Sequence, residues 1–202
     1  MPSVGHLQTE GRTIMEIERK FLVRSIPADL DGYTVKHIEQ GYISADPVIR
    51  VRRTLTSRPG QRGPHKSPVL TDEKAETFTL TVKGRGLMVR EELNLPITKE
   101  AYEHLIGKAE GRIIRKDRYL IPLTGDVPLK DRQESSRESG SLVCELDIFR
   151  EDLAPLVLAE VEFSSEEEAE HFTPPDWFAD DVTADPRYQN ASMVFSTPAD
   201  QT

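Results

Sequence analysis

The sequence predicts a mainly β (α+β) fold, in which eight antiparallel strands close into a barrel with a few flanking helices. Eight segments alternate apolar and polar residues with the period of two that is typical of strands. Clusters of Gly, Pro, Asp or Ser separate these segments, and most connections are short, which favours an antiparallel barrel. The segments are residues 15–23, 36–44, 48–55, 76–84, 88–97, 112–122, 142–149 and 156–163.

Two further segments have the spacing of helices. Residues 98–109 carry apolar side chains on one helical face, and Thr98 is a suitable N-cap. Residues 164–172 contain Ser165 and Glu168 at the spacing of a capping box. The acidic residues that follow Ser165 suit the positive end of a helix dipole, so we interpret them as helix-stabilising and not as a metal site.

The chain reads as one domain spanning residues 15–197. Residues 1–14 lack periodicity and are expected to form a flexible arm, and residues 198–202 a short tail. Residues 56–76 and 125–140 are rich in Pro, Gly, Ser and charge, so we expect each to be a loop insertion between two strands.

The amino-acid composition argues against nucleic acids and membranes as binding partners. The net charge of −9 and the pI near 5.1 disfavour nucleic-acid binding, which depends on basic surfaces. No apolar run is long enough for a membrane span, so we expect no membrane partner. The only cysteine, Cys144, cannot form an intramolecular disulfide, and a cytoplasmic location is expected. A homodimer is the expected assembly if the chain oligomerises.

Charged residues recur on one face of the predicted strands, opposite an apolar face. Because side chains alternate along a strand, charged residues two positions apart share a face. The residues concerned are Glu16, Glu18, Lys20, Arg50, Arg52, Lys83, Arg90, Glu92, Lys116, Arg118, Glu145, Asp147, Glu160 and Glu162. A closed barrel would direct them into a common lumen, whereas a flat sheet would leave them in water.

Such a lumen would suit phosphate chemistry. Clustered carboxylates without His or Cys favour a hard cation such as Mg²⁺ or Mn²⁺. Arginine and lysine bind phosphate oxygens, arginine in a bidentate manner. Carboxylates, a divalent cation and basic side chains are the components that phosphoryl transfer requires.

The sequence resembles the CYTH superfamily, the triphosphate tunnel metalloenzymes, in their compact bacterial form. The segment EIERK at 16–20 resembles the N-terminal E-x-E-x-K signature, and the resemblance extends over residues 15–195. It continues through IEQGYIS, IRVRR, LTVKG, the R-x-E of Arg90 and Glu92, the R-K-x-R-Y of 115–119, ELDIF, LAEVEF and DVTADPRYQN. The resemblance implies a metal-dependent inorganic triphosphatase that releases pyrophosphate and phosphate.

The same resemblance assigns roles to residues. It implies that two Mg²⁺ or Mn²⁺ ions are held by Glu16, Glu18, Glu145, Asp147, Glu160 and Glu162. The triphosphate would be bound by Lys20, Arg50, Arg52, Lys83, Arg90, Lys116, Arg118 and Arg187. The catalytic set would be Glu16, Glu18, Lys20, Lys83 and Asp147. Two positions depart from the family pattern, namely Asn94, where acidic alternation often continues, and Pro186, where a basic residue is common.

Other functions remain open at this point. Related enzymes cyclise ATP or hydrolyse thiamine or nucleoside triphosphates, which would require a pocket for an organic group at the tunnel mouth. A module that binds polyphosphate or a nucleotide without turnover is the alternative outside catalysis.

Overall fold

A computed structural model of the protein describes residues 12–59, 76–84, 88–123 and 142–195. Nine strands form one antiparallel sheet. They are β1 (Arg12–Val23), β2 (Thr34–Ala45), β3 (Val48–Ser57), β4 (Glu76–Lys83), β5 (Val89–Pro96), β6 (Glu110–Pro122), β7 (Val143–Phe149), β8 (Val157–Glu162) and β9 (Phe178–Asp181).

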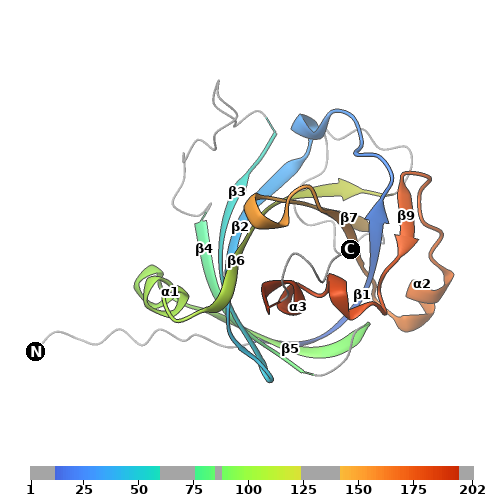
Figure 1. The fold of residues 1–202 in the computed structure, drawn as a ribbon. Coiled ribbons are helices and arrows are strands. Elements are labelled where there is room, and N and C mark those ends of the chain that lie inside the picture. Colours follow the sequence, from blue (N-terminus) through green and yellow to red (C-terminus); the bar gives the residue numbers. More distant parts are fainter. Residues whose placement is uncertain (1–11, 60–75, 85–87, 124–141, 196–202) are drawn as a thin grey trace, which may run out of the picture.

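Eight of these strands close into a barrel, which confirms the predicted fold. The order is β5-β4-β3-β2-β6-β7-β8-β1, and β1 also pairs with β5, so the sheet joins its own edge. Figure 1 looks along the barrel and shows the strands as a ring. The path is not a simple meander, because β2 pairs with β6 and β1 lies between β8 and β5.

Helices cover the apolar outer face of the barrel. The helix α2 (Glu166–His171) packs beside β1 and β8, where a core that includes Phe21, Val161 and Ala169 is buried. On the other side, α1 (Lys99–Ile106) lies against β2, β3 and β4 (Figure 1). Glycine at 41 permits this close approach, because a Cβ there would lie 2.7 Å from both the Cβ of Ala109 and the Cδ1 of Ile106. Covering the outer face leaves the alternate side chains for the lumen.

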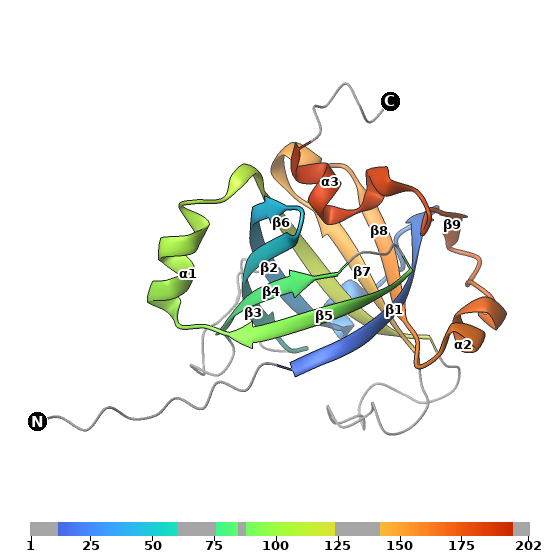
Figure 2. The same ribbon diagram turned by 90° about the horizontal axis from the view of Figure 1, so that it is seen from below.

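The third helix, α3 (Asn190–Phe195), covers one end of the barrel (Figure 2). Its Met193 and Val194 are buried against Tyr42, Ile114 and Leu158, which belong to the lumen-facing sets of their strands. The lumen is therefore apolar where α3 sits and charged farther along the strands.

The structure also differs from the expectations in detail. Strand β1 begins at Arg12, so the predicted arm 1–14 overlaps the barrel by three residues. The strand β9 and the helix α3 were not predicted. Residues 60–75 and 124–141, most of the two expected insertions, lie outside the described residues, as do residues 1–11 and 196–202.

Both predicted helices are present with their predicted caps. Thr98 accepts a hydrogen bond from the Ala101 amide, and Ser165 accepts one from the Glu168 amide. Cys144 is buried in the outer core. None of the helices in the described part of the chain has the length and apolar composition needed to span a membrane.

Candidate active site

Ion pairs between non-adjacent strands establish that the charged side chains converge inside the barrel. Lys83 on β4 donates to Glu16 on β1 at 2.9 Å, although β5 lies between these strands. Arg118 on β6 pairs with Glu160 on β8, across β7. Side chains can bridge an intervening strand in this way only when they project from the same, concave face of the sheet. The predicted shared lumen is therefore confirmed.

Arg118 is the centre of the acidic half of the lumen. Its Nε and Nη2 donate to the two carboxylate oxygens of Asp147, both at 2.7 Å, and it also pairs with Glu145 and Glu160. Burial alone would lower the pKa of Arg118, but these carboxylates outweigh it and raise that pKa well above the ordinary value. Arg118 therefore stays charged and holds three acids together.

Two lysines complete this half. Lys20 Nζ lies 2.9 Å from Glu160 Oε1 and 3.8 Å from Glu18 Oε1. Burial would raise the pKa of Glu160, but Lys20, Arg118 and Lys116 hold it well below the ordinary value. Lys116 Nζ donates to Asp147 at 2.5 Å. Burial lowers the pKa of Lys116 to about 8, and the charge of Asp147 offsets only part of this effect.

On the opposite wall, Glu92 joins two basic residues. Lys83 pairs with both Glu92 and Glu16, and Arg50 Nη2 lies 3.8 Å from Glu92. Arg50 is 4% exposed, and its Nε has no hydrogen-bond partner among the described residues. A buried guanidinium N–H without a partner is energetically unfavourable, so this atom is suited to receive an anionic oxygen.

Among the cations of the lumen that the structure describes, Arg52 has the least compensation from carboxylates. Its Nε donates to the neutral Gln40 at 3.0 Å, and among the described residues no carboxylate lies within ion-pair distance of it. Burial, together with the nearby charges of Arg50 and Arg118, lowers the pKa of Arg52 to about 10. These three arginines create a positive region that an anion would stabilise.

Three predicted residues are placed differently from the rest. Glu162, at the end of β8, pairs in register with Glu18 but is exposed. Arg187 lies in the short 3₁₀ helix Pro186–Tyr188, is exposed, and pairs with Asp185 at 2.8 Å. The backbone of Arg90 on β5 lies opposite Glu16, whereas its side chain lies outside the described ones.

The closing segment before and within α3 contacts the basic residues of the lumen. The backbone carbonyl of Tyr188 accepts a hydrogen bond from Lys20 at 3.4 Å, and Asn190 Oδ1 accepts one from Lys116 at 3.4 Å. Beside α3 lies a cavity of about 610 Å³, whose wall includes Arg50 and Lys83. The cavity therefore connects the basic wall of the lumen with the region around α3.

The carboxylates suit a hard divalent cation by their chemistry. The lumen offers oxygen ligands and, within the described residues, no histidine or cysteine contacts them. Glu92 Oε2 and Glu160 Oε1 are buried, and their close contacts are ion pairs with Lys83 and Lys20. No three Asp, Glu, His or Cys side chains among the described residues form a ready-made ligand cluster, and the acids of the lumen are paired with lysine and arginine instead.

Several neutral residues of the site were missed because they carry no charge. Gln40 holds Arg52, and Thr81 and Asn94 connect Arg50 with Glu92 through hydrogen bonds. For Thr81 the available signal was its place in the alternation, on the face of Lys83. Gln40 is recognised only from the strand register, which places it opposite Arg52.

Comparisons with known proteins agree with this geometry. The chain is 34% identical over 183 residues to an inorganic triphosphatase of Nitrosomonas europaea, covering 91% of this chain and 99% of the relative. It is 30% identical over 186 residues to an inorganic triphosphatase of Acetivibrio thermocellus, covering 89% and 92%.

The fold comparison gives the same result, although no protein-family model matches the sequence. The crystal structure of the inorganic triphosphatase NE1496 superimposes with a TM-score of 0.54 at 32% identity, covering 91% of this chain and 99% of that one. On sequence and fold together, the chain belongs to the family of inorganic triphosphatases.

Proposed function

We propose that this protein hydrolyses inorganic triphosphate to pyrophosphate and phosphate inside the barrel, with Mg²⁺ or Mn²⁺ as the cofactor. The observation that carries the proposal is the convergence of Arg50, Arg52 and Arg118 beside clustered carboxylates in one lumen. The activity of its relatives, which are inorganic triphosphatases, supports the same substrate.

The basic residues have distinct tasks in this proposal. Arg52 lacks a carboxylate partner among the described residues, so it would bind phosphate oxygen without first breaking an ion pair. Arg50 would donate through its unpartnered Nε. Lys20, Lys83, Lys116 and Arg118 would bind further oxygens, and fixed cations of this kind stabilise the charge of a phosphoryl-transfer transition state.

The acidic residues would hold the cofactor. Glu16, Glu18, Glu160 and Glu162, with Glu145 and Asp147, are the expected ligands of two ions, and their oxygens match the preference of Mg²⁺ and Mn²⁺. Bound divalent cations would supply charge neutralisation and a more acidic water for attack on phosphorus. Occupancy by cations would require these carboxylates to exchange lysine or arginine partners, which in turn become available to phosphate.

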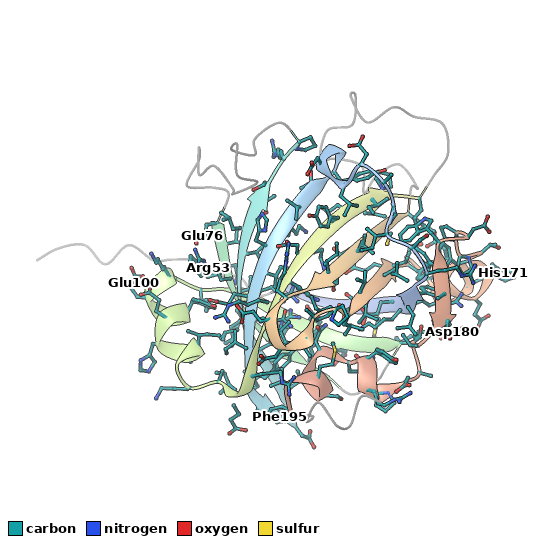
Figure 3. The ribbon with its side chains drawn as sticks, turned by 45° about the horizontal axis from the view of Figure 1, so that its top comes forward. Arg53, Glu76, Glu100, His171, Asp180 and Phe195 are labelled. Carbon is teal, nitrogen blue, oxygen red and sulfur yellow. The ribbon has the colours of Figure 1, made fainter. Side chains whose placement is uncertain are left out.

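A nucleoside triphosphate is the second candidate substrate. The cavity beside α3 has a volume of about 610 Å³, which is in the range of small-molecule pockets. It adjoins Arg50 and Lys83 and is also lined by Tyr42 and Phe195, so it offers space and aromatic contact for an organic group. Figure 3 shows Phe195 at this end of the molecule.

A comparison of two neighbouring arginines tests the proposal. Arg52 faces the lumen, whereas Arg53, the next residue of β3, is exposed and pairs with Glu76 on the outside of the barrel (Figure 3). Arg52→Met should lower kcat/KM for triphosphate about 100-fold, which is equivalent to losing about 3 kcal/mol of transition-state stabilisation. Arg53→Met should change it less than about threefold.

The assay measures phosphate release from triphosphate, pyrophosphate, ATP and thiamine triphosphate with Mg²⁺ or Mn²⁺. Chromatography of the ATP reaction distinguishes hydrolysis from formation of a cyclic nucleotide. Calorimetric binding of triphosphate without phosphate release from any of the four would instead identify a binding module. Equal losses of kcat/KM in Arg52→Met and Arg53→Met would contradict the proposal that triphosphate is hydrolysed inside the lumen.

A further inference from the structure

A row of neutral and charged side chains connects three neighbouring strands on the basic wall of the lumen. Arg50 Nη2 donates to Thr81 Oγ1 at 2.9 Å, and Thr81 Oγ1 donates to Asn94 Oδ1 at 2.7 Å. Asn94 Nδ2 then donates to Glu92 Oε1 at 2.8 Å. Glu92 in turn pairs with Lys83. The row thus connects one basic residue, Arg50, to another, Lys83.

The strand register makes this row continuous. Arg50 on β3 lies opposite Thr81 on β4, and Thr81 lies opposite Asn94 on β5. Two residues farther along β4, on the same face of the sheet, Lys83 lies opposite Glu92 on β5. Residues directly opposite each other on one face of a sheet are within side-chain contact, so no large side-chain movement is needed to form the row.

The direction of each hydrogen bond in the row is determined by chemistry. The guanidinium of Arg50 can only donate, so the Thr81 hydroxyl must accept from it and direct its own hydrogen elsewhere. The carboxylate of Glu92 can only accept, so the amide of Asn94 must present Nδ2 to it and Oδ1 to Thr81. Asparagine meets both requirements, whereas an ionised aspartate could accept from Thr81 but could not donate to Glu92.

Burial makes this arrangement stiff. Thr81 is fully buried, and Arg50 and Glu92 are 4% and 5% exposed. Asn94 is half-buried. Water therefore cannot readily replace a lost partner of Thr81, Arg50 or Glu92, and a missing hydrogen bond there would leave a buried polar group unsatisfied. The same wall carries the unpartnered Nε of Arg50 and borders the cavity beside α3, through Arg50 and Lys83.

We infer that Thr81 and Asn94 are positioning residues, which fix Arg50 and Lys83 in one relative arrangement for the phosphate group nearest the α3 cavity. The inference rests on the proposed triphosphatase function. Thr81 and Asn94 act through the two basic residues and do not contact the reacting atoms. Asn94, which departs from the acidic alternation, is on this view the residue that allows a single carboxylate, Glu92, to serve both cations.

Substitutions of matched shape test the inference. Asn94→Asp keeps the size and the acceptor for Thr81, but removes the donor to Glu92 and places a second carboxylate beside it. It should lower kcat for triphosphate about tenfold or more, and weaken triphosphate binding in calorimetry by a similar factor. Thr81→Val should lower kcat similarly, and Thr81→Ser should recover most of the loss because it restores the hydroxyl. Thr77→Val on the same strand, at an exposed position, is the control and should match the wild type.

A double variant separates a connected row from two independent contacts. If the row acts as one unit, Thr81→Val combined with Asn94→Asp should lose little more kcat than Asn94→Asp alone. Wild-type kcat and triphosphate affinity in Asn94→Asp would overturn the inference, as would equal losses in Thr81→Val and Thr81→Ser. A wild type that binds triphosphate without hydrolysing it would overturn the proposed function alone, because affinities would still test the row. A wild type that does neither would overturn both.

Discussion

Replacing Arg118 with methionine should destabilise the folded protein, because Arg118 offsets the repulsion among three carboxylates in the lumen. Arg118 is 7% exposed and binds Asp147 through two hydrogen bonds, while also pairing with Glu145 and Glu160. Methionine has a similar length but no charge. In the variant, Asp147 retains Lys116 and Glu160 retains Lys20, whereas Glu145 loses the cation with which it pairs.

The size of the effect follows from burial. Removing one partner of a buried ion pair costs about 3–5 kcal/mol, and the retained lysines place this case near the lower end, about 3 kcal/mol. For a chain of this length, about 1 kcal/mol shifts the melting temperature by roughly 2–4 °C, so Arg118→Met should melt about 6–12 °C lower than the wild type in the absence of divalent cations.

The matched control is Arg150→Met. Arg150 also pairs with an aspartate, Asp117, but its side chain is 58% exposed. A pair screened by solvent contributes about 0–1 kcal/mol, so this variant should melt less than about 4 °C below the wild type. Calorimetric or circular-dichroism melting of the three proteins at one pH and salt concentration measures the difference.

The effect of Mg²⁺ on these melting temperatures tests the proposed cofactor. A cation that binds near Glu145, Asp147 and Glu160 would replace the missing charge, so Mg²⁺ should raise the melting temperature of Arg118→Met more than that of the wild type. A melting temperature within about 2 °C of the Arg150→Met control, with no larger response to Mg²⁺, would refute this account of the lumen.

Two further predictions, made with three variants, test the fold around the site. Gly111 has φ +68°, and a Cβ there would lie 2.6 Å from the Val194 carbonyl oxygen in α3, so Gly111→Ala should destabilise the protein by about 1–3 kcal/mol in urea unfolding. Gly107→Ala, at φ −68°, should instead be neutral or slightly stabilising. Burial would raise the pKa of Asp117, but hydrogen bonds with His37 and Arg150 hold it below the ordinary value. Its stabilisation is therefore present above the unfolded pKa of about 3.9 and lost as the pH falls through the lower, folded pKa. Asp117→Asn should thus be less stable than the wild type at pH 7, and urea unfolding should show the difference in stability shrinking as the pH falls below the unfolded pKa of about 3.9.

Alternation along the chain was sufficient to predict the eight barrel strands and to place the buried charged residues that the structure describes on one face. Glu18, Lys20 and Glu160 are buried together as expected, because period two assigns side chains to faces without knowledge of neighbouring strands. Strand neighbours were not predictable in the same way. Nothing local to β2 indicates that it pairs with β6, because this contact depends on how the whole sheet closes.

The alternation of apolar and polar residues also could not predict short elements or the roles of neutral residues. The strand β9 has four residues and α3 has six, too few for a periodicity to be recognised, and α3 depends on its contacts with Tyr42 and Ile114 for burial. Thr81 and Gln40 appear in the sequence as ordinary strand residues. Their hydrogen bonds to arginine exist only because the register places them opposite Arg50 and Arg52.

The charge balance of the lumen gives a physical reason for binding cation and triphosphate together. Six carboxylates and five cationic side chains are joined by ion pairs in the described residues, and Arg52 brings the two signs level. Triphosphate alone would add negative charge beside these acids, and a divalent cation alone would add positive charge beside these bases. Both are unfavourable in a buried site. When the divalent cation and triphosphate bind together, their charges largely cancel. The cation pairs with carboxylates and frees lysine and arginine for triphosphate, and triphosphate frees carboxylates for the cation. Each ligand should therefore strengthen the binding of the other.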